Sequence, residues 1–89
     1  MKAAVIGESG LEIRDAPIPR PKSTEVLVKV RAAGLNRADL LMATGRFQGS
    51  HGVAGVVAGL EWAGEVIEVG RDVTNVKRGA RVMCAGAGG

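Results

Sequence analysis

The chain has 89 residues, so it makes one small domain (1–89) at most, and a domain of this size has a narrow margin of stability. Its net charge of +3 comes from 12 basic and 9 acidic residues that are interspersed, without the basic stripe and interleaved aromatics that nucleic-acid binding uses. No apolar run is long enough for a membrane span or a signal peptide, and a single cysteine excludes an internal disulfide, which favours a reduced, cytoplasmic setting.

The N-terminal residues predict a β-hairpin followed by an extended connector. Lys2–Ile6 is a short apolar stretch, Gly7–Gly10 has turn residues, and Leu11–Arg14 alternates apolar and polar side chains as a half-buried strand does. The prolines at 17, 19 and 21 follow. Because proline cannot donate to a strand ladder, this stretch is expected to be irregular and to run along an edge or the surface.

Glu25–Ala33 is the clearest strand in the sequence. Period-two alternation places a set of small apolar side chains on one face of it. This expected set is Val26, Val28, Val30 and Ala32.

A short helix is predicted directly after this strand. Gly34 ends the strand, and Asn36 has a side chain suited to a helix N-cap. Asp39 lies three residues on, where a carboxylate is favoured by the positive end of the helix dipole. The helix is expected to carry the apolar residues in 40–43 and to end near Gly45.

The second half predicts a loop and two more strands. Arg46–Gly59 is Gly-rich and is interpreted as a loop, and Glu61–Val69 as a strand in which Gly64 marks a bulge or a close backbone approach. Turn residues within 70–79 lead to a last strand, Ala80–Cys84. Many short strands, one short helix and frequent turns predict a mainly β, barrel-like domain.

Three segments together resemble one protein family. Ala33–Leu41 resembles the AAGxNxxDxxxxxG segment of the medium-chain dehydrogenase/reductase superfamily, in its zinc-free quinone oxidoreductase (zeta-crystallin-like) branch. Gly59–Val66 is similar to that branch's GxExAGxV strand, and Val69–Val82 to its VGxxVxxxxxGDRV hairpin, with Ala80 where the family has Asp. The resemblance implies a GroES-like, partly open barrel that is incomplete relative to the family domain.

The resemblance also implies a function. It points to NADPH-dependent reduction of a quinone or another conjugated carbonyl (an enone), in a cleft between the barrel and a Rossmann domain, by a homodimer. No G-x-G-x-x-G lies between a predicted strand and helix, so the Rossmann domain that binds most of the NADPH is expected to be absent from 1–89. We therefore expect a fragment that is inactive alone. The alternative is a GroES-like binding or interaction module without enzymatic activity.

No zinc site is expected. The alcohol dehydrogenase branch of the resembled family has a Cys where Asn36 stands and a His where Leu60 stands, and a catalytic zinc needs about three protein ligands. The remaining ligand types, His51 and Cys84, are single residues in distant segments.

The candidate cleft residues are Asn36, Asp39 and Phe47, and each has a second interpretation. Asn36 either hydrogen-bonds the nicotinamide region or a substrate carbonyl, or only caps the helix. Asp39 either contributes to the cleft or only stabilises the helix N-terminus. Phe47 either stacks on a planar substrate or packs in the core. No catalytic residue is predicted, because the sequence offers no nucleophile triad or paired carboxylates and the hydride chemistry belongs to the cofactor.

Overall fold

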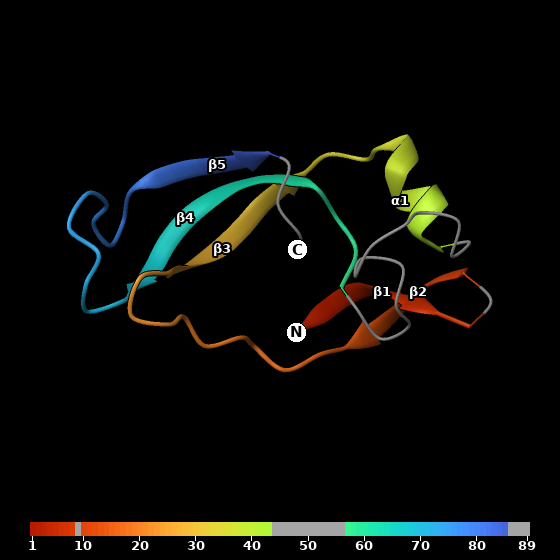
Figure 1. Ribbon diagram of the computed structural model, residues 1–89, viewed down its shortest axis with the longest axis horizontal. Coiled ribbons are helices and arrows are strands. Elements are labelled where there is room, and N and C mark those ends of the chain that lie inside the picture. Colours follow the sequence, from red (N-terminus) through yellow and green to blue (C-terminus); the bar gives the residue numbers. More distant parts are fainter. Residues whose placement is uncertain (9, 44–56, 86–89) are drawn as a thin grey trace.

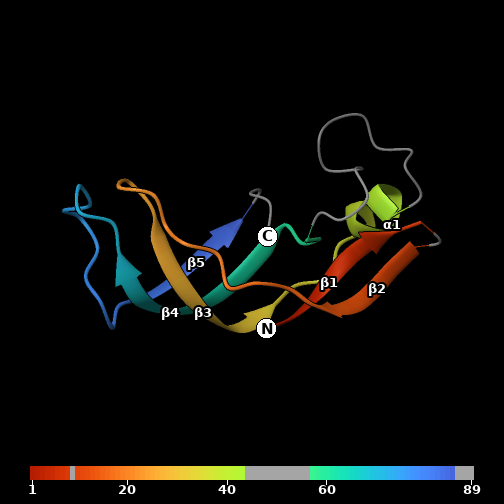
Figure 2. The same cartoon turned by 90° about the horizontal axis from the view of Figure 1, so that it is seen from below.

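The computed structural model describes residues 1–8, 10–43 and 57–85. These residues form a two-stranded and a three-stranded antiparallel sheet with one short helix (Figure 1). The elements in chain order are β1 (Lys2–Gly7), β2 (Gly10–Asp15), β3 (Val26–Ala33), α1 (Arg37–Ala43), β4 (Glu61–Val69) and β5 (Arg81–Ala85). The prediction of a mainly β, partly open GroES-like barrel is confirmed, since the described strands curve without closing (Figure 2).

The predicted opening hairpin is confirmed and is slightly longer than expected. β1 and β2 pair from Lys2–Asp15 to Gly7–Gly10, and an ion pair of 3.1 Å joins Lys2 Nζ to Asp15 at the open end. Gly10 has a φ of 131°, which an L-residue rarely adopts, so the turn depends on glycine here.

The apolar side chains of β2 are not half-buried as its alternation predicted. Ile13 is 73% exposed, whereas Val5 and Ile6 of the neighbouring strand are 5% and 3% exposed. The difference in exposure follows from the positions of the two strands in the sheet. β1 has partners on both sides, since Val5 also bridges to Val57, while β2 is paired only to β1 among the described residues.

The three-stranded sheet has the order β3-β4-β5, with β4 in the centre. The predicted limits of β4 match the structure, and β5 is shifted by one residue from its predicted limits. The proline-bearing connector has no regular secondary structure, as expected, and runs from β2 to β3 beneath the sheet in Figure 1.

The predicted apolar face of β3 holds for Val26, Val28 and Val30 and is wrong at Ala32. Register shifts lie between Leu27 and Val28 and between Val30 and Ala32. The first shift leaves Ile67 of β4 without a partner on β3, so Val26, Val28 and Val30 stay on one face of β3. The second leaves Arg31 of β3 without a partner on β4, so Ala32 lies on the other face and Ala33 takes its place. A bulge reverses the side-chain alternation, which a strict period of two cannot anticipate.

Gly64 explains why the strands can approach closely at this point. A Cβ built at Gly64 would collide with the carbonyl oxygen of Lys29 on β3. Both alternatives predicted for this glycine, a bulge and a close backbone approach, are thus found on the same stretch of the β3–β4 ladder.

The apolar core is small and divided between the two sheets. Val5 and Ile6 of β1 and Val66 of β4 are its buried apolar residues among those described. Val66 is 1% exposed and is also held by its main chain, which accepts from Gly79 N at 2.8 Å and donates to Ala80 O at 2.9 Å. Trp62 and Cys84 are half-buried opposite each other on β4 and β5.

We expect Val66→Ala to destabilise the chain by about 2 kcal/mol, because it removes two fully buried methyl groups and leaves a cavity. Ile13→Ala is the matched control, since a side chain 73% exposed contributes within about 0.5 kcal/mol. Urea denaturation of both variants measures the difference. Equal losses would show that the core does not lie at Val66.

Candidate functional site

The candidate site lies where β3 leads into α1. The last residue of β3, Ala33, pairs with Trp62 of β4, and the N–H of Gly34 still donates to the carbonyl of Glu61 at 3.2 Å. The chain thus stays attached to the start of β4 one residue beyond the strand. From there it turns into α1, which packs against both strands of the hairpin (Figure 1).

Asn36 and Asp39 build the start of α1. The main-chain N–H of Asn36 donates to Asp39 Oδ2 at 2.9 Å, and the N–H of Asp39 donates to the carbonyl of Asn36 at 3.0 Å. This is the part of a capping box in which a side chain at the third helical position reaches back to the N-cap residue. The predicted helix start is confirmed, but the side chain that supplies the capping hydrogen bond is that of Asp39.

Two polar atoms at this cap are buried without a hydrogen-bond partner. They are Asn36 Nδ2, a donor, and Asp39 Oδ1, an acceptor. Asp39 is 7% exposed and is the buried charged residue of the described part of the chain. An unsatisfied buried polar group costs about 1–3 kcal/mol. Such a group in a folded protein calls for an explanation, and a bound ligand that supplies the missing partner is one.

Glu61 is a residue of this site that the sequence analysis did not single out. A Cβ built at Gly34 would fall on the carboxylate of Glu61, so the Glu61 side chain lies directly against the main chain of Gly34. The sequence places Glu61 at the start of a strand and Gly34 at the end of another. Only the antiparallel pairing of β3 with β4 brings the two together.

The structure describes only some of the other residues discussed from sequence. Phe47, the third predicted cleft residue, lies outside the described residues, as does His51. Leu60 is half-buried just before β4, and Cys84 lies within β5. Within residues 1–8, 10–43 and 57–85, no group of three or more His, Cys, Asp or Glu side chains is placed to hold a metal ion.

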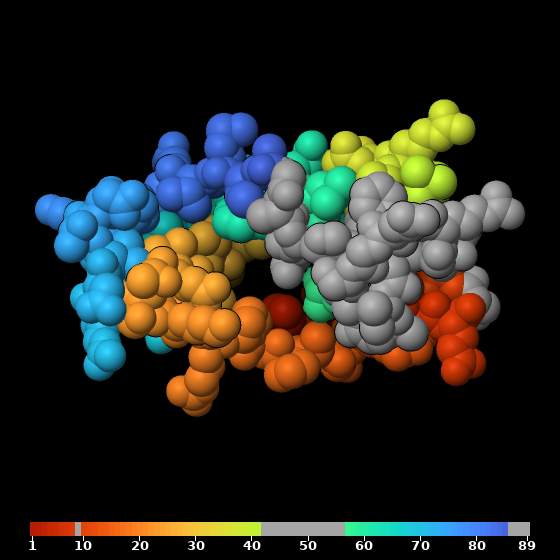
Figure 3. All heavy atoms as spheres, viewed as in Figure 1, coloured from red at the N-terminus to blue at the C-terminus, as the bar shows by residue number. Residues whose placement is uncertain are grey.

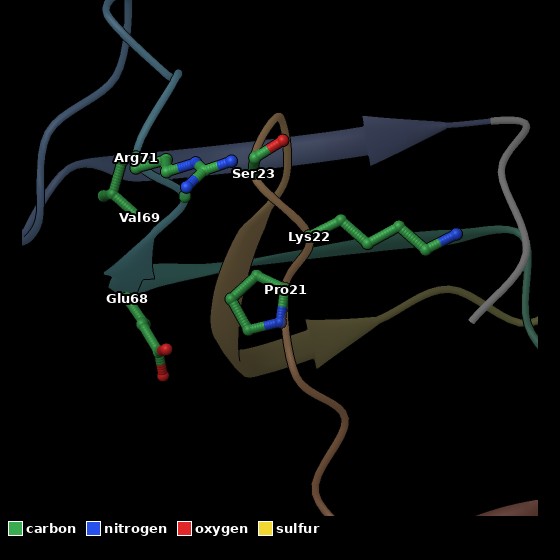
Figure 4. Close-up of a pocket in the computed structure, with 7 residues that line it drawn as sticks. Pro21, Lys22, Ser23, Glu68, Val69 and Arg71 are labelled. Carbon is green, nitrogen blue, oxygen red and sulfur yellow. The ribbon is translucent and has the colours of Figure 1, made fainter.

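A shallow hollow of about 410 Å³ lies at the opposite end of β4 from Glu61 (Figure 4). It is lined by Pro21, Lys22, Ser23, Glu68, Val69, Gly70 and Arg71. In Figure 4 the Lys22 ammonium points away from the Arg71 guanidinium, and the Glu68 carboxylate points to another side. Because these charged groups do not converge on one point, the hollow offers no centre for binding a ligand.

A second depression is visible on the face of the molecule shown in Figure 3. It lies between the connector and the curved sheet, and the start of the chain forms part of its floor. In this view α1 lies to one side of the depression.

Comparison with known proteins shows the family. Residues 22–88 match the model of the alcohol dehydrogenase GroES-like domain. The chain therefore belongs to this domain family, within the medium-chain dehydrogenase/reductase superfamily. Its relatives are quinone oxidoreductases and related dehydrogenases and reductases, that is, a family of oxidoreductases.

Three relatives illustrate the similarity. An acryloyl-coenzyme A reductase of Metallosphaera sedula is 41% identical over 85 residues, which cover 93% of this chain and 25% of the relative. The quinone oxidoreductase of Coxiella burnetii is 34% identical with a TM-score of 0.84, covering 93% of this chain and 28% of that one. The quinone oxidoreductase of Escherichia coli complexed with NADPH is 25% identical with a TM-score of 0.87, covering 98% and 27%. The chain thus spans about a quarter of the length of these relatives.

The hydrogen bonds of the cap separate the roles of Asn36 and Asp39 in stability. We expect Asp39→Ala to lower the melting temperature by roughly 4–8 °C, because the capping hydrogen bond contributes about 1 kcal/mol. Asn36→Ala keeps the main-chain N–H that donates to Asp39 and removes an unsatisfied donor, so it should not destabilise the chain. Calorimetry of both variants checks this. A larger loss for Asn36→Ala would assign the capping role to the Asn36 amide.

Proposed function

We propose that this chain is the N-terminal, substrate-side part of an NADPH-dependent reductase of quinones or other conjugated carbonyl compounds. The observation that carries the proposal is the pair of buried, unpartnered atoms at the α1 cap, one donor and one acceptor, in a GroES-like fold of an oxidoreductase family. Two further facts support it. One structural relative is a quinone oxidoreductase complexed with NADPH, and another relative reduces acryloyl-coenzyme A, whose name denotes a conjugated thioester.

The unpartnered atoms fit polar groups of the proposed ligands. Asn36 Nδ2 can donate to a carbonyl oxygen, either that of the substrate or that of the nicotinamide carboxamide. Asp39 Oδ1 can accept a hydrogen bond from an amide or a hydroxyl group. NADPH supplies the hydride when bound, and the role of these residues is to bind and orient the reacting groups.

The donor of Asn36 has a specific effect if its partner is the substrate carbonyl. Hydride addition to a conjugated carbonyl places negative charge on the carbonyl oxygen. A donor that is already buried and oriented stabilises that charge more than water does, because it needs no reorganisation. Asp39 accepts a hydrogen bond of 2.9 Å from the main-chain N–H of Asn36. It thereby fixes the main-chain position from which the Asn36 side chain extends.

The remaining parts of the proposal concern the complete enzyme. Most of the NADPH would be bound by a Rossmann domain outside residues 1–89, Phe47 would contribute to the substrate cleft, and the enzyme would act as a cytoplasmic homodimer on small molecules. The reaction would use no zinc, since an asparagine amide and Leu60 occupy the two ligand positions of the zinc-dependent branch. In the described residues, no helix is long and apolar enough to cross a membrane.

In the complete enzyme we expect Asn36→Ala to lower kcat/KM about tenfold, which corresponds to losing roughly 1.4 kcal/mol of transition-state stabilisation. Asn75→Ala is the matched control, because Asn75 is exposed in the turn region before β5. Steady-state kinetics with NADPH and a benzoquinone measure both. Unchanged kinetics for Asn36→Ala would remove Asn36 from the site. If the wild-type protein reduces no quinone or enone, the interaction-module alternative gains support.

For the 89-residue chain alone we expect no NADPH binding of micromolar affinity and well under one zinc per chain. The reasons are the lack of a dinucleotide-binding motif and the lack of zinc ligands at positions 36 and 60. Isothermal titration with NADPH and metal analysis of protein purified without chelator test the two expectations separately. Micromolar binding would overturn the domain assignment, and a stoichiometric zinc would overturn the zinc-free branch.

A further inference from the structure

The contact between Glu61 and Gly34 has no explanation in the backbone conformation of Gly34. The glycines whose φ lies in the region that L-residues rarely adopt are Gly10, Gly59 and Gly79 among the described residues, and Gly34 is not one of them. A larger residue could therefore adopt the backbone angles at position 34. A Cβ at this position would meet the end of the exposed Glu61 side chain, which would have to move off the Gly34 main chain.

The segment from Gly34 to Asn36 is held mainly at its two ends. Leu35, its middle residue, is 97% exposed and adds no packing. The segment is fixed at one end by Glu61, through the main-chain hydrogen bond from Gly34 N and through the side chain lying over Gly34. At the other end it is fixed by the hydrogen bond from Asn36 N to Asp39.

Among the described residues, no ion pair holds the Glu61 carboxylate in place. The ion pairs of the described residues join Lys2 to Asp15, Arg14 to Glu12 and Arg31 to Glu65, and none includes Glu61. Its atoms lie against the Gly34 main chain, so the shape of the side chain matters at this point more than its charge. Glycine loses more conformational freedom on folding than any other residue, and a side chain packed on it restricts that freedom.

We propose that Glu61 is a positioning residue of the candidate site: by packing on the bare main chain of Gly34, it holds the segment that presents the Asn36 amide and the Asp39 carboxylate. This inference rests on the function proposed above for Asn36, but its central claim about Glu61 concerns geometry and is testable without any reaction. Glu61 contacts no reacting group in this scheme and acts through Gly34.

The first test is a double-mutant cycle on the chain. Gly34→Ala should be less favourable in the wild-type chain than in Glu61→Ala, because the new methyl group displaces the Glu61 side chain from the Gly34 main chain. In the Glu61→Ala background the same change should cost nothing or stabilise the chain, because the space is then open and alanine restricts the unfolded state. If Gly34→Ala is as damaging without Glu61 as with it, the contact does not constrain Gly34 and the proposal fails.

The second test is hydrogen exchange measured by NMR. In Glu61→Ala the main-chain amide of Asn36 should exchange about tenfold faster, because the segment opens locally. The amide of Gly70, which donates to Glu25 O at 2.8 Å at the far end of β4, should be unchanged and serves as the internal control. Glu61→Gln keeps the shape of the side chain and should restore protection at Asn36. Equal exchange at Asn36 in wild type and Glu61→Ala would overturn the proposal.

Kinetics of the complete enzyme separate this inference from the proposed function. Glu61→Ala should lower kcat/KM, as Asn36→Ala does, and Glu61→Gln should retain the wild-type kcat/KM. Glu68→Ala is the control, because it is the same change at the exposed far end of β4, and it should leave kcat/KM unchanged. If Asn36→Ala lowers kcat/KM and Glu61→Ala does not, the positioning role is wrong and the function stands. If Asn36→Ala has no effect while exchange at Asn36 depends on Glu61, the function is wrong and the positioning role stands.

Discussion

The pairing between the end of β3 and the start of β4 is the constraint on which the candidate site depends. It brings Ala33 opposite Trp62 and joins Gly34 N to the carbonyl of Glu61. Each later feature of the site starts from this anchor. The chain can turn into α1 only from a fixed point, and the capping hydrogen bond between Asn36 and Asp39 then sets where the helix begins. If the β3–β4 register moved by one residue, both polar side chains would be displaced together.

The bulges of the β3–β4 ladder, at Ile67 on β4 and at Arg31 on β3, are part of the same constraint. They place Val28, Val30 and Ala33 on the face of the sheet that carries Trp62 and Val66. A regular β3 would have placed Ala33 on the opposite face from Val28 and Val30, since the bulge at Arg31 reverses the alternation. Gly64 makes the local approach of the two strands possible, because the carbonyl of Lys29 fills the space of a Cβ there. Bulges increase local twist, and the sheet they belong to is the curved one in Figure 2.

The cap shows how stability and binding are set against each other in a small domain. The described part of the domain has a small apolar core, made of Val5, Ile6 and Val66. Even so, two polar atoms at the cap, Asn36 Nδ2 and Asp39 Oδ1, remain buried without hydrogen-bond partners. A sequence optimised for stability alone would satisfy or remove these atoms. Violations of local rules of this kind are expected at functional sites, where a ligand completes the hydrogen bonding. The position of the violation, at the junction of both sheets and the helix, is the structural basis of the proposed function.

The sequence by itself determined the elements of this protein and its family, because those depend on local patterns. The hairpin, the connector, the limits of Glu61–Val69 and the start of the helix at Asn36 follow from turn residues, alternation and capping chemistry within a few residues. Only the tertiary structure decided which apolar faces are covered, as the exposed Ile13 shows, and which side of β3 carries Ala32. It alone placed Glu61 on Gly34 and left two polar atoms unpartnered at the cap. Register, bulges and burial arise from contacts between distant segments, and no local pattern in one segment specifies what the other segment brings to it.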